Sequence, residues 1–242
     1  MGFQAAPVNV YNTIGIPGEI AFDGPQRAGP ANIVASGNPN VIGYAYTLNA
    51  GGDPNPGASS PAPSSVRVGG TGLFAGILVN PKSYTTSGTT SGALMPSLAL
   101  PDNSIGEFLG MGEIFVALPA AAAIGDSVYY DNTTGALGSV TNFVGTGSIT
   151  TTVLTITATT AGALGIGSVV TGPNVLPGTI ITSLGTGTGG NGTYNLNQTQ
   201  TAASGAIAAG AIAPTGKTLV PNAKVTRYTI TAAGVAVIKL TN

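Results

Sequence analysis

The sequence predicts an all-β protein, and three observations favour this class. The chain of 242 residues contains 38 glycines and 17 prolines, residues that often form tight turns. Hydrophobic residues still make up 43% of the chain, which supplies apolar area for a packed core and argues against disorder. The apolar residues stand in short β-branched and aromatic runs bounded by glycine or proline, a pattern typical of short strands. We therefore expect a β-rich core, either a sandwich or a barrel-like fold.

The first 30 residues predict an extended N-terminal arm with one or two brief strands. Their apolar runs are short, and four prolines interrupt them: Pro7, Pro17, Pro25 and Pro30. An arm of this kind either lies on a neighbouring subunit or forms an ordinary edge segment of its own chain. Both alternatives stay open from the sequence.

Residues 31–144 and 213–242 predict one β core built from both ends of the chain. Strand-like runs occur at 40–48, 72–80, 108–118, 126–137, 224–230 and 235–240. The run at 126–137 predicts a hairpin because Asn132 and Gly135 supply turn conformations, and the last two runs predict another. The alanine-rich stretch at 120–125 is compatible with one helical turn before Gly125 stops it.

Residues 145–212 differ in composition from the rest of the chain. Four short β-like runs, at 150–158, 166–172, 178–184 and 192–199, are separated by glycine clusters. No Asp, Glu, Lys or Arg occurs between Asn132 and Gly216. We interpret residues 145–212 as an inserted Gly/Thr-rich β module.

Charge patterning argues against several classes of partner. Charged residues make up 6% of the chain, against about 25% in an average soluble domain, and the net charge is -1. The Lys and Arg residues are scattered, which leaves no basic stripe for nucleic acid. The longest apolar run is too short to span a membrane and is interrupted by Pro119. No basic residue precedes Arg27 and no apolar segment follows Met1, so we expect synthesis in the cytoplasm without a signal peptide.

The absence of histidine and cysteine removes the usual groups of catalysis. Ser-His-Asp hydrolases, thiol enzymes and ordinary zinc sites cannot be built without them. Glu107 and Glu113 are the candidates for a catalytic carboxylate pair, but the glycines between them leave their mutual geometry undefined. We expect no catalytic residue, no cofactor and no metal site.

Two short motifs have competing interpretations. The residues Gly70-x-Gly72-x-x-Ala75 match the spacing of a dinucleotide-binding loop, but a proline-rich stretch precedes them and a strand-like run follows. We interpret them as a glycine-lined turn into a strand. The segment 131–135, DNTTG, has oxygen-bearing side chains suited to calcium but lacks further acidic ligands, so a plain hairpin turn is favoured.

Four segments together resemble the structural cement (head decoration) proteins of tailed bacteriophages. In chain order they are IGIPGEIAFDGPQRAGP (14–30), VGGTGLFAGILVNPKSY (68–84), MGEIFVALPAAAAIGDSVYYDNTTGAL (111–137) and PNAKVTRYTITAAGVAVIKLTN (221–242). The resemblance rests on their order and combined length, over most of residues 1–140 and 217–242. The insert is similar to Gly/Thr-rich β modules of several phage structural proteins.

The resemblance implies a protein on the outer surface of an icosahedral phage head. Such a protein would bridge neighbouring major capsid subunits and reinforce the shell, and a homotrimer is the expected form. Its partners would be the major capsid protein and itself, with no nucleic acid and no membrane. The insert would point outward, where it could touch the host surface.

For the contacts with the capsid or a neighbouring subunit, we select residues of the arm. These are Glu19, Phe22, Asp23 and Arg27, with Arg67 as a second choice. Deleting residues 1–30 is expected to abolish head binding and to leave the β core folded.

Alternatives from other classes stay open at this point. A tail-fibre or adhesin-type glycan-binding module would explain the Thr, Asn and Gly content, and it predicts exposed aromatic residues on one face. Tyr194 is the only aromatic residue of the insert after Phe143, which gives this hypothesis little support. A carboxylate-pair glycosidase would lose activity when Glu107 or Glu113 is changed. A self-assembling tail or surface-layer protein would form tubes or sheets, whereas a cement protein stops at a closed oligomer.

Overall fold

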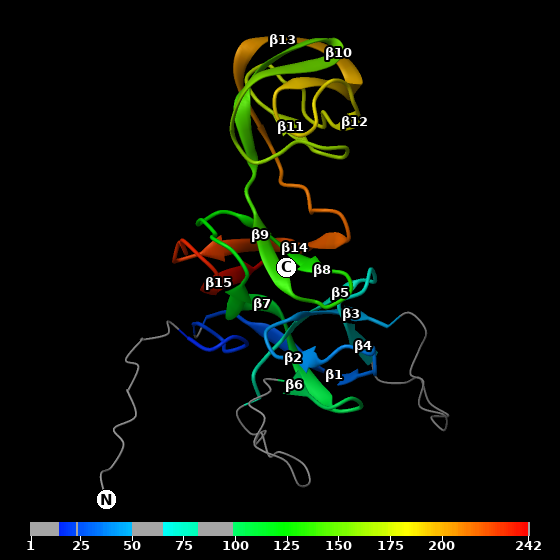
Figure 1. The fold of residues 1–242 in the computed structure, drawn as a ribbon, viewed down its shortest axis with the longest axis vertical. Helices are drawn as coiled ribbons and strands as arrows, with labels where there is room; N and C mark the ends of the chain where they lie inside the picture. The colour runs from blue at the N-terminus through cyan, green and yellow to red at the C-terminus, as the bar shows by residue number, and fades with distance from the viewer. Residues whose placement is uncertain (1–14, 23, 50–64, 82–98, 242) are drawn as a thin grey trace, which may run out of the picture.

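The computed structural model describes residues 15–22, 24–49, 65–81 and 99–241 (Figure 1). Its strands, in chain order, are β1 (Arg27–Ile33), β2 (Asn40–Val41), β3 (Ala45–Leu48), β4 (Ser65–Val68), β5 (Phe74–Leu78), β6 (Ala99–Leu100), β7 (Ile105–Leu118), β8 (Ser127–Asp131), β9 (Leu137–Val140), β10 (Phe143–Ala161), β11 (Val170–Thr171), β12 (Ile181–Leu184), β13 (Gly192–Ala209), β14 (Lys217–Thr226) and β15 (Gly234–Leu240). The described residues contain no helix, so none of them forms a helix able to span a membrane. The all-β class is confirmed.

The helical turn considered for residues 120–125 is not formed. Ala122 and Ile230 exchange backbone hydrogen bonds in both directions, each 2.9 Å long, in an isolated β-bridge. A single helical turn is costly to nucleate, so pairing with a neighbouring segment outweighs the helix propensity of alanine in a run this short.

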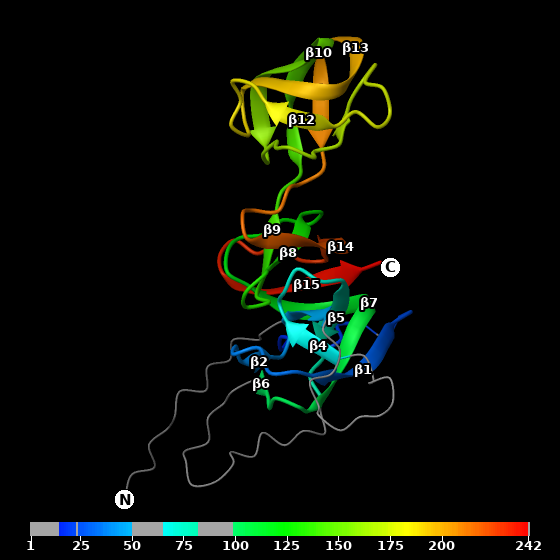
Figure 2. The same ribbon diagram turned by 90° about the vertical axis from the view of Figure 1, so that its right-hand side faces the viewer.

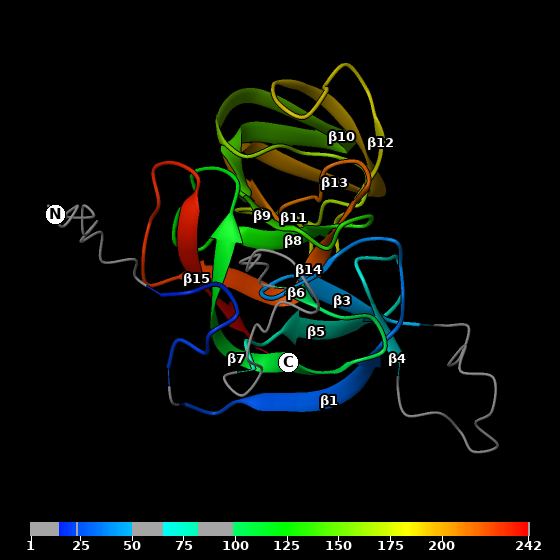
Figure 3. The same cartoon turned by 60° about the horizontal axis from the view of Figure 1, so that its bottom comes forward.

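Five strands close into a small barrel. Their order is β1-β4-β3-β5-β7, and β1 pairs again with β7 to complete the ring. Figure 3 shows β1 and β7 side by side, with β5 next to them. Inward and outward residues alternate, as in β4, where Val66 and Val68 are buried and Arg67 is exposed. Tyr46 and Phe108 pack inside, with ring centroids 4.9 Å apart. Of the two predicted core types, this part of the chain adopts the barrel.

Strand β7 continues beyond the barrel and begins a second sheet (Figure 2). Its first half pairs with β1 and β5, while its second half, residues 112–118, pairs with β15. The sheet then continues through β14, β8 and β9. Its buried face includes Ile114, Val128, Val225 and Ile238. The core therefore joins strands from the first 140 residues to β14 and β15 near the end of the described chain, as the sequence predicts.

The described residues of the N-terminal arm lie on their own chain. The Gly18 amide donates a hydrogen bond to the Phe115 carbonyl (2.7 Å), and the Ala21 amide donates to the Glu113 carbonyl (2.8 Å). Residues 27–33 form β1 itself. Residues 15–22 and 24–30 thus contact their own chain, and β1 is a strand of the barrel that pairs with both β4 and β7. Residues 1–14 and Asp23 lie outside the described residues.

Residues 143–209 contain a separate four-stranded sheet, which lies at one end of the molecule in Figure 1. β10 and β13 pair along most of their length, and β11 and β12 both pair with β13. The buried side chains of these strands form a hydrophobic cluster of their own. This sheet therefore has the parts that an independent folding unit needs.

The two halves of β10 fold back on each other, and two glycines allow this close approach. A Cβ atom at Gly145 would lie 2.5 Å from the Ala158 carbonyl oxygen, and one at Gly147 would lie 2.6 Å from the Thr155 carbonyl oxygen. Both distances are far inside van der Waals contact, so a residue with a side chain would push the two halves apart.

Asn142 lies where this sheet joins the core. Its Oδ1 accepts hydrogen bonds from the Ser127 hydroxyl (3.2 Å) and from the Ala211 amide (3.1 Å). Asn142 precedes β10 and Ala211 follows β13, so the two connecting segments are adjacent in space.

We propose that residues 145–212 are an independent module, and a deletion tests this. Replacing them with a linker of about four Gly and Ser residues should leave the core folded, because the segments to be joined are adjacent. The melting temperature of the core should stay within about 5 °C of its value in the full chain. A shortened chain that aggregates, or that melts without a cooperative transition, would contradict the division.

Candidate functional site

The carboxylates considered for catalysis lie far apart. Glu107 and Glu113 both belong to β7, where six residues at about 3.3 Å each separate them by about 20 Å along the strand. Glycosidase pairs need a separation of about 5 to 9.5 Å. Glu113 is moreover ion-paired with Arg227. Over the described residues, no group of three or more His, Cys, Asp or Glu side chains gathers to hold a metal ion.

The glycine motif at residues 70–75 begins in the turn after β4 and ends within β5, so it is a turn into a strand, as predicted. The Gly70 amide donates to the Asn132 carbonyl (2.7 Å), so it is already used within the fold. The strand β5 follows directly in place of a helix, so a nucleotide phosphate would lack the helix N-terminus that this motif needs.

The segment DNTTG forms the turn between β8 and β9. One carboxylate oxygen of Asp131, Oδ1, accepts hydrogen bonds from the amides of Thr133 and Thr134, both at 2.9 Å. The other, Oδ2, lies 2.6 Å from Lys217 Nζ. The Lys217 hydrogen bond, together with these amides, holds the pKa of Asp131 well below its ordinary value. The Asp131 carboxylate therefore stabilises the hairpin turn. A plain hairpin turn is what the sequence predicts for this segment.

The Asp131–Lys217 ion pair predicts that the stability of the fold decreases at acidic pH. The lowered pKa of Asp131 means that its stabilising effect is complete above the pKa of the unfolded chain, about 4, and is lost as the pH falls below it. Asp131→Asn should lower the free energy of unfolding by about 1 to 2 kcal/mol at pH 7, and by much less at pH 2. Denaturant unfolding at both pH values measures the difference. A double-mutant cycle with Lys217→Met is the control, and a coupling energy independent of pH would contradict the assignment.

The predicted contact residues do not gather at one place. Arg27 pairs with Met111 on β7. Phe22 directly follows Ala21, whose amide is hydrogen-bonded to the Glu113 carbonyl on the same strand. Glu19, which is half-buried, also lies along β7, since its carbonyl accepts from the Phe115 amide (2.9 Å). Arg67 follows the residue that pairs with Ile33, at the opposite end of β1. Asp23 lies outside the described residues.

Phe22 forms a surface cluster with two charged residues. Its side chain is 41% exposed, and the Arg227 guanidinium lies 3.5 Å from the centre of its ring. Arg227 also forms the ion pair with Glu113. We call these three residues the Phe22 cluster. Tyr228, next in the chain, is likewise 41% exposed. A stacked arginine with exposed aromatic residues is typical of the centres of protein interfaces.

Sequence reasoning missed Arg227 because its partners are remote in the chain. Arg227 directly follows β14, and its φ of 64° places it in the left-handed region, so that the strand ends there. Only the pairing of β14 with β15, and of β15 with β7, brings it to Glu113. The segment KVTRYTI predicts a strand from its alternation, but nothing in it indicates that Arg227 contacts Glu113 or Phe22.

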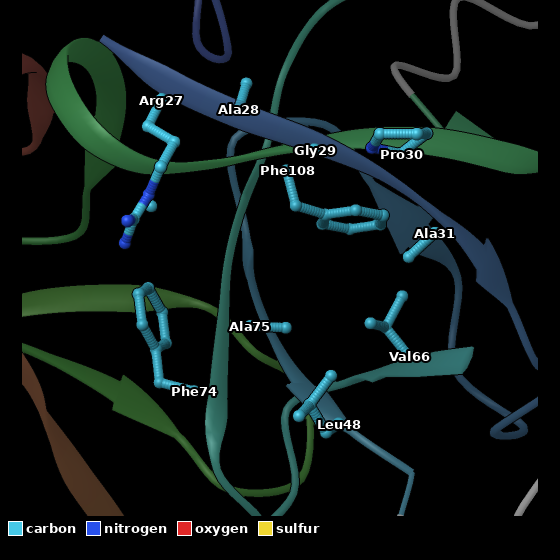
Figure 4. A pocket seen from close by; sticks show the side chains of 11 residues that line it. Arg27, Ala28, Gly29, Pro30, Ala31, Leu48, Val66, Phe74, Ala75 and Phe108 are labelled. Atoms are coloured by element: carbon cyan, nitrogen blue, oxygen red, sulfur yellow. The ribbon is translucent and has the colours of Figure 1, made fainter. Parts of the chain in front are cut away.

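A cavity of about 510 Å³ is lined by residues of the barrel strands (Figure 4). Residues from β1, β3, β4, β5 and β7 line it. Most of these residues are apolar, and Arg27 is the only charged one among them. In Figure 4 the Arg27 side chain points towards Phe74.

The aromatic residues of the separate sheet are buried. Phe143 and Tyr194 are both fully inaccessible to solvent. The Tyr194 hydroxyl donates to the Gly190 carbonyl (2.6 Å) and accepts from the Gly189 amide (3.0 Å), so it is used inside the fold. The exposed aromatic face that the glycan-binding hypothesis predicts is not present among residues 143–209.

Comparison with protein families gives a match over residues 3–172. The matching model is described as "Structural cement protein (E217 gp24/Pam3 gp6)". The matched span contains every strand of the barrel, continues through β8, β9 and β10, and ends one residue after β11. Three of the four segments quoted from the sequence lie inside it, and the segment 221–242 lies beyond it. No curated protein matches the chain.

Proposed function

Because the chain belongs to the structural cement protein family of bacteriophages, we propose that it binds the outer surface of an icosahedral phage head and bridges neighbouring major capsid subunits. Family membership makes it a structural protein of the phage capsid. The observation that carries the proposal is the match over residues 3–172, which includes the whole barrel. We propose further that the protein binds the major capsid protein, that it forms a homotrimer, and that it lies outside the shell.

The physical character of the surface supports this role. Charged residues are 6% of the chain, so binding through long-range charge attraction is weak and shape complementarity dominates. A cement protein needs only modest interfaces, of about 1,000 Å² each, because many symmetric copies act together on one lattice. A homotrimer would match three-fold positions on such a lattice.

We propose the Phe22 cluster and the neighbouring arm residues as one contact with the capsid. Phe22, Ile16 and Tyr228 are each more than 40% exposed, which leaves apolar area uncovered beside β7. Glu19 and Asp23 flank Phe22 in the chain, and Arg67 is kept as a separate contact because it lies elsewhere on the barrel.

The separate sheet would project away from the shell in this arrangement. Figure 1 places it at the far end of the molecule from β1 and β6. If the barrel faces the capsid, the sheet of β10 to β13 is outermost and can reach the host surface. Its lack of charge and of exposed aromatic residues favours added bulk over specific glycan capture.

Co-sedimentation with expanded, undecorated heads of the parent phage tests the proposal. The wild-type chain should bind saturably, and Phe22→Ser should weaken binding about tenfold or more, as for a central interface aromatic. Leu184→Ser, which removes a 43% exposed apolar side chain from the distant sheet, is the matched control and should bind like wild type. A wild-type chain that stays in the supernatant would refute head binding. Normal binding by Phe22→Ser would refute only the proposed contact.

A further inference from the structure

Two short segments join the separate sheet to the core (Figure 1 and Figure 2). Residues 141–142 lead from β9 into β10, and residues 210–216 lead from β13 to β14. Among the described residues, no strand pairing crosses this junction, and the hydrophobic cluster of the separate sheet shares no residue with the two clusters of the core. The orientation of the separate sheet therefore depends on the contacts that the two connecting segments make.

The Asn142 side chain gathers contacts of both segments at one oxygen atom. Besides the Ser127 hydroxyl and the Ala211 amide, the Lys224 ammonium donates a hydrogen bond to Asn142 Oδ1 (3.4 Å). Lys224 Nζ also donates to Ser127 Oγ (2.6 Å), so the two core side chains hold each other in place. The Ala211 amide and the Lys224 ammonium can only donate, which requires the oxygen of the Asn142 amide on this side. We call these four residues the Asn142 clasp.

The Asn142 clasp connects three parts of the molecule. Ser127 and Lys224 belong to β8 and β14 of the core, while Asn142 and Ala211 belong to the two connecting segments. The main chain of Asn142 contacts the separate sheet, because a Cβ atom at Gly162, just after β10, would lie 2.5 Å from the Asn142 carbonyl oxygen. Asn142 thus contacts the separate sheet with its main chain and the core with its side chain.

The second connecting segment contains a glycine suited to a hinge. Gly210 directly follows β13, and a Cβ atom there would meet no heavy atom of the described residues within 4 Å. Hinges commonly consist of a few residues at the ends of elements, which absorb changes in the backbone dihedral angles. Thr141, in the first segment, is exposed. Once the Asn142 clasp opens, rotation in both segments can tilt the separate sheet.

We propose that the junction is a hinge and that the Asn142 clasp holds the separate sheet in the orientation seen in Figure 1. Removing the shared acceptor breaks three hydrogen bonds, one of them from a charged donor, and should lower the ratio of clasped to released molecules about tenfold or more. The inference concerns the free protein and does not depend on the proposed function. On a phage head, the clasp would set the direction in which the separate sheet projects.

Distances between two spin labels test the hinge. The chain contains no cysteine, so Thr199→Cys on β13 and Ala233→Cys between β14 and β15 provide two exposed attachment sites. Pulsed electron spin resonance should give one narrow distance distribution for this labelled chain. Adding Asn142→Ala should broaden the distribution, whereas Asn142→Asp keeps an acceptor for the same donors and should leave it narrow. Asn195→Ala, the matched control, removes an asparagine hydrogen bond within the separate sheet and should also leave it narrow.

A second variant changes only the core side of the clasp. Ser127→Ala combined with Lys224→Met removes two donors, leaves both connecting segments unaltered, and should also broaden the distribution. Thermal unfolding shows that each variant is folded, and if Asn142→Ala is not, the second variant decides alone. An unchanged narrow distribution in the folded variants would overturn the proposal. So would a distribution for the parent labelled chain as broad as that of the variants, because the clasp would then hold nothing.

Discussion

Gly135→Val is expected to lower the free energy of unfolding of the core by about 3 to 5 kcal/mol. Gly135 has a φ of 74°, and a Cβ atom there would lie 2.5 Å from the Ala45 carbonyl oxygen and 2.7 Å from Val68 Cγ2. The turn between β8 and β9 packs against the barrel at this point, since the Ala45 amide donates to the Gly135 carbonyl (2.9 Å). A side chain would force the second sheet away from the barrel.

Gly216→Val separates the steric effect from backbone strain. Gly216 has the same φ of 74°, but a Cβ atom there would meet no heavy atom within 4 Å. Its substitution should therefore cost only the strain of a β-branched residue in the left-handed region, about 1 to 2 kcal/mol. Denaturant unfolding of both variants measures the difference. Equal losses of stability would mean that the contact between turn and barrel does not hold the two sheets together.

Deleting residues 1–30 is expected to unfold the barrel, whereas deleting residues 1–14 is not. The longer deletion removes Arg27 to Pro30, which pair with residues 107–111 of β7, and so opens the ring of strands. The expectation that the core survives this deletion is therefore revised, because β1 is part of the core. The shorter deletion leaves every described contact in place.

Cooperative thermal unfolding monitored by circular dichroism distinguishes the two deletions. The chain without residues 1–14 should melt within about 5 °C of the full chain. The chain without residues 1–30 should aggregate or lose its cooperative transition. A cooperative transition in the longer deletion, at an unchanged temperature, would show that β1 contributes little to the barrel.

Local patterns in the sequence were sufficient to predict the fold class and many strands. The runs at 72–80 and 108–118 contain β5 and most of β7, because alternating β-branched and aromatic residues match a half-buried strand. The hairpin at 126–137 was likewise predictable, since Asn132 and Gly135 signal a turn between apolar runs.

Pairing between remote segments was not predictable. β10 and β13 extend through residues 143–149 and 200–209, where glycine, alanine and serine carry little strand propensity and the ladder between the two strands holds them extended. The closure of the barrel depends on β1 meeting both β4 and β7, contacts that no local pattern encodes.

For the candidate contact residues, too, the residues themselves could be selected from the sequence but their surroundings could not. Phe22 and Arg27 could be selected because an aromatic residue and a cation stand out in an arm with few charges. Their surroundings could not be predicted, since Arg227 reaches Phe22 through strand pairing and the cavity beside Arg27 exists only when five strands close. The spacing of Glu107 and Glu113 became interpretable only when both were placed on one strand.

The most direct test of the account is electron cryo-microscopy of undecorated heads incubated with the purified chain. We predict density for the barrel and second sheet over the junctions between neighbouring major capsid subunits, with the sheet of β10 to β13 outermost. Heads that show no added density, or added density that contacts a single capsid subunit without reaching its neighbour, would contradict the claim that this protein bridges the shell.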